Sequence, residues 1–98
     1  MIQDIAIALS TSTTPIIQPY YENDKTKIIA IGLKKDVVLE KHTAPSKAQI
    51  LIIQRTVTFR TATFSKSINT YETYEIPLEV EHEVIGDADS IFLLILSK

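Results

Sequence analysis

The chain has 98 residues, a formal net charge of −2, 45% hydrophobic residues and no cysteine. Its length is sufficient for one domain with its own core, and the lack of cysteine excludes disulfides, cysteine-zinc sites and thiol catalysis. The sequence contains 16 Ile, 5 Val and 11 Thr, and β-branched residues of this kind favour strands over helices. We therefore expect a single all-β domain.

Charge is divided unevenly along the chain. Residues 1–66 carry nine Lys and Arg against five acids, whereas residues 67–98 carry one Lys against seven acids. The acidic second part and the lack of an arginine cluster argue against a nucleic-acid surface. The first residues lack the basic charge of a signal peptide, and no apolar run approaches the length of a membrane span. We expect a cytoplasmic protein that binds neither nucleic acid nor membrane.

The N-terminal segment is open to two interpretations. Residues 1–14 contain apolar side chains at helical spacing, but residues 5–9 are equally consistent with a buried strand. Prolines flank residues 16–18, which we interpret as an edge strand or an extended arm. The predicted organisation is an N-terminal arm over residues 1–24 and a main domain over residues 25–98.

From residue 25 onward, short apolar segments alternate with polar turns. Strands are expected over residues 27–33, 37–40, 48–53, 56–64, 73–76 and 90–96, and turns over residues 23–25, 34–36, 65–69 and 86–89. In residues 78–84, apolar residues and His82 share one parity and three glutamates share the other, so an extended segment places His82 on the apolar face. Strands at this spacing are typical of a β-sandwich or barrel.

The two histidines lie at characteristic distances from other residues. His42 lies six residues after Asp36 and is followed by Thr-Ala-Pro, and His82 lies five residues after Pro77. These strings resemble the sequence motifs of small bacterial cupins of the H-x-A-P type, and the resemblance runs from residue 28 to the C-terminus. It implies a single cupin-type jelly-roll β-barrel, also called a double-stranded β-helix or RmlC-like fold, with an N-terminal arm or short helix.

The first cupin motif, G-x5-H-x-H-x3,4-E-x6-G, aligns with residues 36–55. His42 matches the first His of the motif. Ala44 stands at the second His, and Ala48 stands at the Glu, with Gln49 one residue further on. The resemblance therefore implies a metal site that has lost half of its ligands.

The second motif, G-x5-P-x-G-x2-H-x3-N, aligns with residues 71–86, where Pro77 and His82 match. The whole chain has two glycines, and one of them, Gly86, stands at the Asn of this motif. The four glycines that the two motifs require are replaced by Asp36, Arg55, Tyr71 and Glu79. The resemblance thus implies a divergent cupin.

A typical cupin metal site uses three His and one carboxylate, a set that suits iron, manganese, nickel or zinc. Because only His42 and His82 remain, we expect no catalytic residue and no cofactor. We interpret His42, Gln49 and His82 as lining a pocket for a small organic ligand in a non-catalytic binding or interaction domain. The alternative is a metal-dependent enzyme of dioxygenase or isomerase type, in which His42 and His82 hold Fe, Mn, Ni or Zn. A third hypothesis is a structural interaction protein with a filled barrel.

The segment ahead of the barrel also bears on assembly. Residues 16–21 are rich in Ile and Tyr. Edge strands with such side chains need cover, and small cupins often pair through sheet edges or exchanged N-terminal strands. We therefore expect a homodimer.

Overall fold

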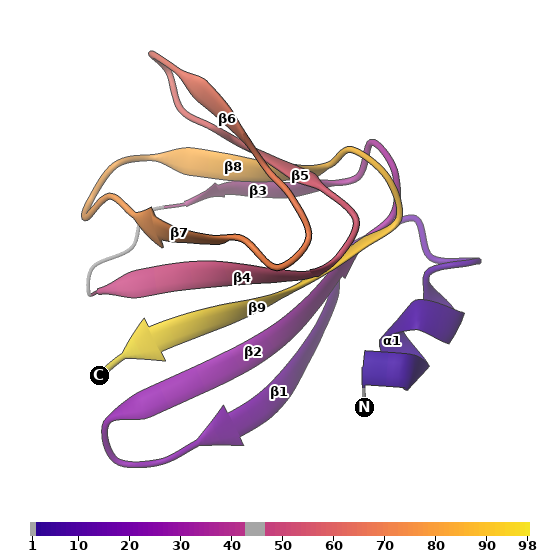
Figure 1. Ribbon diagram of the computed structural model, residues 1–98, viewed down its shortest axis with the longest axis horizontal. Coiled ribbons are helices and arrows are strands. Elements are labelled where there is room, and N and C mark those ends of the chain that lie inside the picture. The colour runs from indigo at the N-terminus through magenta and orange to yellow at the C-terminus, as the bar shows by residue number, and fades with distance from the viewer. Residues whose placement is uncertain (1, 43–46) are drawn as a thin grey trace.

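The computed structural model describes residues 2–42 and 47–98, with side chains for residues 2–39 and 47–98. These residues form one helix and nine strands: α1 (Ile2–Ala8), β1 (Ile16–Glu22), β2 (Thr26–Leu33), β3 (Val38–His42), β4 (Ala48–Gln54), β5 (Val57–Arg60), β6 (Ser65–Ile68), β7 (Thr73–Ile76), β8 (His82–Gly86) and β9 (Ser90–Ser97). The strands build two antiparallel sheets, a five-stranded sheet of order β1-β2-β9-β4-β7 and a four-stranded sheet of order β3-β8-β5-β6 (Figure 1). The all-β jelly-roll prediction is confirmed.

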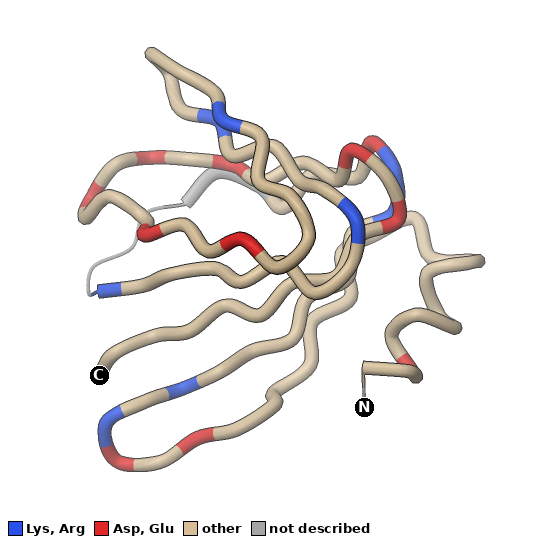
Figure 2. The backbone as a smooth tube through the Cα atoms, viewed as in Figure 1, with Lys and Arg blue, Asp and Glu red and all other residues tan. Residues whose placement is uncertain are grey.

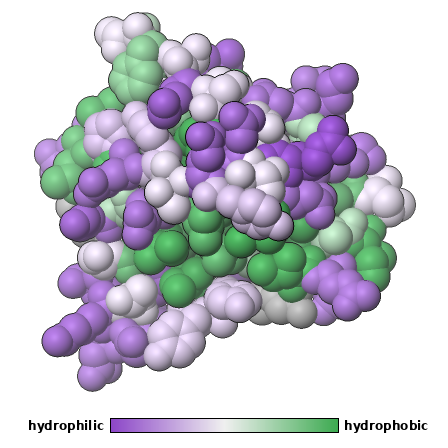
Figure 3. All heavy atoms as spheres, viewed as in Figure 1, coloured by the Kyte–Doolittle hydropathy of each residue, from purple (hydrophilic) through white to green (hydrophobic). Residues whose placement is uncertain are grey.

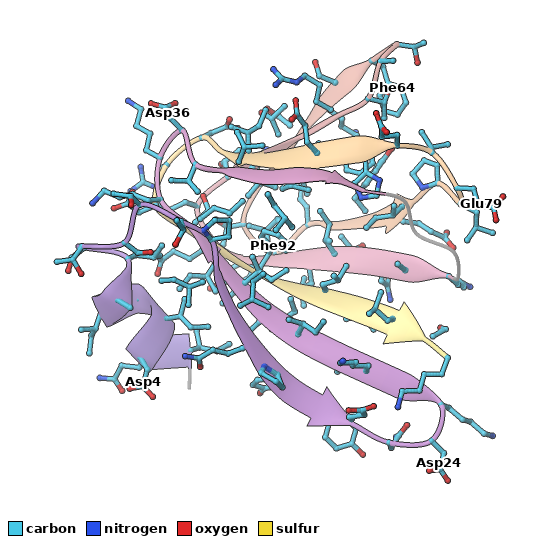
Figure 4. All side chains as sticks on the ribbon, turned by 180° about the vertical axis from the view of Figure 1, so that it is seen from behind. Asp4, Asp24, Asp36, Phe64, Glu79 and Phe92 are labelled. Atoms are coloured by element: carbon cyan, nitrogen blue, oxygen red, sulfur yellow. The ribbon has the colours of Figure 1, made fainter. Side chains whose placement is uncertain are left out.

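The core lies between the two sheets and follows from the alternation of each strand. In β4, Ala48, Ile50 and Ile52 are buried, and in β5 Val57 and Phe59 are buried. Figure 4 shows Phe92 of β9 in the space between the sheets, where it joins this core. Because apolar side chains from both inner faces meet here, burial of this surface is the main force that holds the sheets together.

A second apolar cluster lies on the outer face of the five-stranded sheet. The buried Ile5 and Leu9, on α1 and directly after it, pack there against Ala30 and Ile91. Figure 3 shows hydrophobic side chains gathered over the β2–β9–β4 part of the sheet and extending toward α1. The central strands β2, β9 and β4 are therefore largely apolar on both faces, which explains why they read as nearly continuous hydrophobic runs.

Two features fix α1 on the sheet. Gly32 of β2 lies directly under the helix, where an added Cβ would stand 2.5 Å from Cγ2 of Ile5. The ammonium group of Lys34 donates hydrogen bonds to the carbonyl oxygens of Leu9, at 3.3 Å, and Ser10, at 3.0 Å. A cation at this end of a helix satisfies carbonyls that have no partner within the helix and opposes their negative charge.

The helix α1, the one helix in the described residues, lacks the length and apolar character required to cross a membrane.

The C-terminus is tied to the β1–β2 hairpin. The Lys98 amide donates to the carbonyl of Lys25 at 2.8 Å, and the Lys98 ammonium donates to the carboxylate of Glu22. This ammonium holds the pKa of Glu22 below its usual value, with a smaller contribution from Lys27. Since the pKa is lowered on folding, the stabilisation is present near neutral pH and is lost as the carboxylate is protonated in acid.

The structure settles or corrects several sequence predictions. Residues 2–8 are helical, and the segment flanked by prolines is an edge strand that runs along β2. The turn predicted over residues 65–69 is wrong, because residues 65–68 form β6 and pair with β5. The extended segment predicted over residues 78–84 is wrong in its first half, because β8 begins only at His82.

Four residues hold the backbone in the left-handed region. They are the non-glycine residues with positive φ in the described ranges, at 69° for Asp36, 64° for Arg55, 67° for Tyr71 and 55° for Glu79. These are the four positions at which the cupin motifs have glycine. Each lies in a connection from one sheet to the other: β2 to β3, β4 to β5, β6 to β7 and β7 to β8. The turns have therefore kept the conformation of the motif glycines although the glycines are gone.

Glycine is expected to be the better residue at these turns. We predict that Glu79→Gly is more stable than Glu79→Ala by about 1 kcal/mol, because both variants lose the same side chain but only glycine is free of the Cβ that penalises positive φ. Urea unfolding of the two variants measures the difference. The matched control is Glu75, an exposed residue within β7, where the order must reverse because glycine weakens a regular strand. Equal stability at position 79 would contradict the prediction.

The contact between α1 and β2 is also testable. We predict that Gly32→Ala lowers the free energy of unfolding by about 1–3 kcal/mol, because its Cβ forces the helix away from the sheet. Adding Ile5→Ala, which removes the clashing methyl group, must cost less in the Gly32→Ala background than in the wild type. A double-mutant cycle by denaturant unfolding gives this coupling. Additivity within about 0.5 kcal/mol would show that the two residues do not meet.

Candidate functional site

His82 begins β8, and its side chain points into the barrel. It is 1% exposed and stacks on Phe59, with ring centroids 4.8 Å apart and an interplanar angle of 27°. Its Nδ1 lies 2.9 Å from the carbonyl oxygen of Val80. The predicted placement of His82 on the apolar face is confirmed. The stacking and the hydrogen bond explain how an imidazole is accommodated in an apolar wall.

The Phe59 ring connects His82 to other aromatic residues. Phe59 also lies 5.0 Å from the ring of Tyr74 on β7 and 6.2 Å from the ring of Phe64. Figure 4 labels Phe64, which lies near the end of the β5–β6 hairpin. The ring on which His82 stacks is thus itself packed against Tyr74 of the other sheet.

The backbone of β3 brings His42 opposite His82. The two residues are Cα partners in the antiparallel pairing of β3 with β8. The side chain of His42 lies outside the described residues, as does Ala44. The structure therefore places the two motif histidines on neighbouring strands at the same level of the sheet.

Gln49 takes a different position. Along β4 it lies between Ala48 and Ile50, which face the core, and its own side chain is exposed. Its Cα partners are Glu75 of β7 and Ile95 of β9. Gln49 therefore lies on the outer face of the five-stranded sheet, and the structure does not bring it together with His82.

A pocket of about 110 Å³ adjoins His82 on the four-stranded sheet. It is bounded by the end of β5 and the loop that follows, and by the beginning of β8. Its lining residues are Arg60, Thr61, Ala62, Glu81, His82 and Glu83. Figure 2 shows the basic residues of the β5–β6 hairpin above the acidic residues of β8 and the segment that precedes it. The pocket therefore combines both signs of charge.

An ion pair across β5 and β8 organises this pocket. Arg60 and Glu83 are Cα partners, and the guanidinium donates through both Nε, at 2.7 Å, and Nη2 to the same carboxylate oxygen, Oε1. The side chain of Glu83 is 13% exposed, whereas that of Arg60 is 52% exposed. The carboxylate is therefore held in place, and about half of the Arg60 side chain remains accessible.

A metal ion beside His82 would need several donors grouped around it, because sites for iron, manganese or zinc use three or four protein donors. Within the side chains of residues 2–39 and 47–98, no three His, Asp or Glu are grouped as metal ligands. The described side chains therefore do not by themselves complete such a site around His82.

Sequence reasoning missed the pairing that forms the pocket. Arg60 has no motif around it, and Glu81 and Glu83 read as the solvated face of a strand. The two residues are brought together by the register of β5 against β8, which sets Arg60 opposite Glu83. That register depends on the turns at both strand ends and is not written in either segment alone.

Comparison with solved structures agrees with the fold described above. No family model matches the sequence, and no curated protein matches it. Among solved structures, a cupin superfamily protein of Desulfitobacterium hafniense has a TM-score of 0.77 at 12% identity, covering 85% of this chain and 76% of the other. An RmlC-like cupin of Desulfovibrio desulfuricans has a TM-score of 0.77 at 15% identity, covering 86% and 82%. A cupin domain of Bordetella pertussis has a TM-score of 0.73 at 18% identity, covering 87% and 94%.

These likenesses, together with two antiparallel sheets and left-handed turns at all four motif glycine positions, show that the chain has the cupin fold. The expected resemblance to RmlC-like cupins is confirmed at the level of the fold.

We predict that breaking the Arg60–Glu83 pair destabilises the protein more than breaking the exposed Lys47–Glu75 pair. We expect Arg60→Gln to lower the free energy of unfolding by about 1–2 kcal/mol, because it leaves a mostly buried carboxylate without its partner. The control is Lys47→Gln, whose partner Glu75 lies 3.7 Å away with both side chains exposed, at 74% and 66%. That change should cost no more than about 0.5 kcal/mol. Equal losses in urea unfolding would contradict the assigned burial of Glu83.

Proposed function

We propose that this cupin domain binds a small polar organic molecule in the pocket beside His82 and performs no metal-dependent reaction. The observation that carries the proposal is the pocket itself, where a fixed carboxylate and an accessible guanidinium converge next to a buried imidazole. Small-molecule sites typically combine a concave shape with a few precisely held polar groups. The stacked and hydrogen-bonded His82 supplies a rigid wall for such a site.

The chemistry of the donors supports binding over catalysis. A metal-dependent mechanism requires several ligands with open coordination positions, and only two motif histidines are present. The imidazole of His82 is fixed by the carbonyl of Val80 and the ring of Phe59 and is 1% exposed, so little of it is accessible to a substrate. Acid–base catalysis requires a proton acceptor within reach of a substrate, and a ring held in this way favours a binding role.

The pairing of His42 with His82 supports the second candidate, a metal-dependent enzyme with a two-histidine site. The two residues are Cα partners across β3 and β8. Such a site predicts tight binding of Fe, Mn, Ni or Zn. The two candidate functions therefore differ in metal content.

The test combines metal analysis with ligand mapping on the full chain. We expect untagged protein to contain far less than one metal ion per chain, and Zn²⁺ or Ni²⁺ to leave the imidazole resonances of His82 unchanged. We expect some members of a panel of small anionic, cationic, zwitterionic and neutral polar compounds to shift the backbone amides of residues 60–62 and 81–83 in two-dimensional NMR spectra. His82→Phe keeps a ring on Phe59 and serves as the control for metal binding.

Two results would overturn the proposal. One is a stoichiometric metal that is lost both in His42→Ala and in His82→Phe while the fold is retained, which establishes the second candidate. The other is a panel in which no compound of any charge affects residues 60–62 and 81–83, which leaves the pocket without a binding role.

A further inference from the structure

The charges around the pocket specify a class of ligand. Three charged side chains line it beside His82, whose own side chain points into the barrel: the guanidinium of Arg60 and the carboxylates of Glu81 and Glu83. A purely anionic ligand meets two carboxylates, and a purely cationic ligand meets a guanidinium. A ligand with one positive and one negative charge pairs with a carboxylate and with the guanidinium at the same time.

The geometry gives each charge of the pocket a distinct role. Glu83 is held by Arg60 through a single oxygen, Oε1, so its other oxygen is not used by that pair. Glu81 is exposed at the pocket rim. The two carboxylates therefore offer acceptors for an ammonium group, which is a donor without acceptor capacity.

Arg60 provides the complementary contact. Its side chain is 52% exposed although it pairs with Glu83, so the guanidinium presents surface to the pocket. A guanidinium has five N–H donors in a planar arrangement, and two of its nitrogens are occupied by Glu83. The remaining donors suit a carboxylate, which they bind with charge-assisted hydrogen bonds.

The volume limits the size of the ligand. The pocket measures about 110 Å³, and one water occupies about 30 Å³ in the liquid. The pocket therefore holds the volume of roughly four waters, which restricts the enclosed part of a ligand to a few non-hydrogen atoms. A small α-amino acid carries an ammonium and a carboxylate on the same carbon atom, so both charges lie within a few non-hydrogen atoms.

From this combination we infer that the ligand is a small zwitterion, an amino acid or a close analogue, whose ammonium binds Glu81 and Glu83 and whose carboxylate binds Arg60. The inference rests on the proposed binding function of the same pocket and names its ligand class. Because the pocket is small and open to solvent, binding is expected in the millimolar range, where affinity is limited by the few atoms in contact.

The test uses three probes that differ by one charged group. Free alanine is the zwitterion, propionate lacks its ammonium, and ethylamine lacks its carboxylate. Titrations of the full chain at neutral pH, followed by NMR at the amides of residues 60–62 and 81–83, are expected to show alanine binding at least about tenfold more tightly than either probe, as charge-assisted hydrogen bonds require.

Variants assign each charge to its partner. Arg60→Gln should remove the preference for alanine over ethylamine, and Glu81→Gln should weaken the preference for alanine over propionate by about threefold, the effect of one exposed charge. Glu75→Gln, an exposed carboxylate on the other sheet, is the matched control and should change neither preference. Because the side chain of Glu81 is exposed, Glu81→Gln is expected to fold. It therefore tests the inference even if Arg60→Gln does not fold.

The outcomes separate this inference from the proposed function. Equal or tighter binding of propionate or ethylamine overturns the zwitterion and leaves a pocket of another ligand class. Binding of only neutral compounds from the wider panel has the same consequence. No response to any compound overturns both. Loss of alanine binding in Glu75→Gln shows that the response arises elsewhere on the chain and also overturns the inference.

Discussion

A jelly roll depends on chain reversals that carry each strand from one sheet to the other, and here four such reversals are made by residues in the left-handed region. Asp36, Arg55, Tyr71 and Glu79 each hold a positive φ between a strand of the five-stranded sheet and one of the four-stranded sheet. If one of these residues returned to an ordinary conformation, the next strand would leave in a different direction. The strand register, the core and the pocket all follow from these turns. The strain at each is of order 1 kcal/mol, and burial between the sheets offsets it.

The same turns explain what sequence could predict. Spacing predicted the strands between residues 27 and 53 and the strand over residues 73–76. The motif alignment marked the four positions of the missing glycines, and the structure shows that the backbone is left-handed at each of them. Alternation failed over residues 78–81 because a glutamate in the left-handed conformation interrupts the pattern, and glutamate carries no local signal for it. Residues 65–68 were missed because their strand is polar and exposed, and it is defined by pairing with β5 rather than by composition.

The candidate site shows the limit of motif reasoning in a divergent chain. His42 and His82 are Cα partners on the neighbouring strands β3 and β8. The polar groups around His82, however, come from Arg60 and Glu83, and neither of these is a defined position of the two motifs. Their proximity arises from cross-strand register. The interior side of β8 carries a stacked imidazole while neighbouring residues build a charged pocket. A single strand can thus hold the core and present a polar site because successive side chains point to opposite faces.

The packing of α1 against β9 also has a consequence for folding during synthesis. Ile5 and Leu9 are synthesised long before the surface that buries them is complete, because that surface includes Ile91. The five-stranded sheet shares this delay, since β9 is the strand that joins β2 to β4. Until β9 emerges, the nascent chain exposes an apolar helix and two unjoined halves of a sheet, a state prone to aggregation. A domain with so many long-range contacts is therefore expected to fold once β9 is available rather than progressively from its N-terminus.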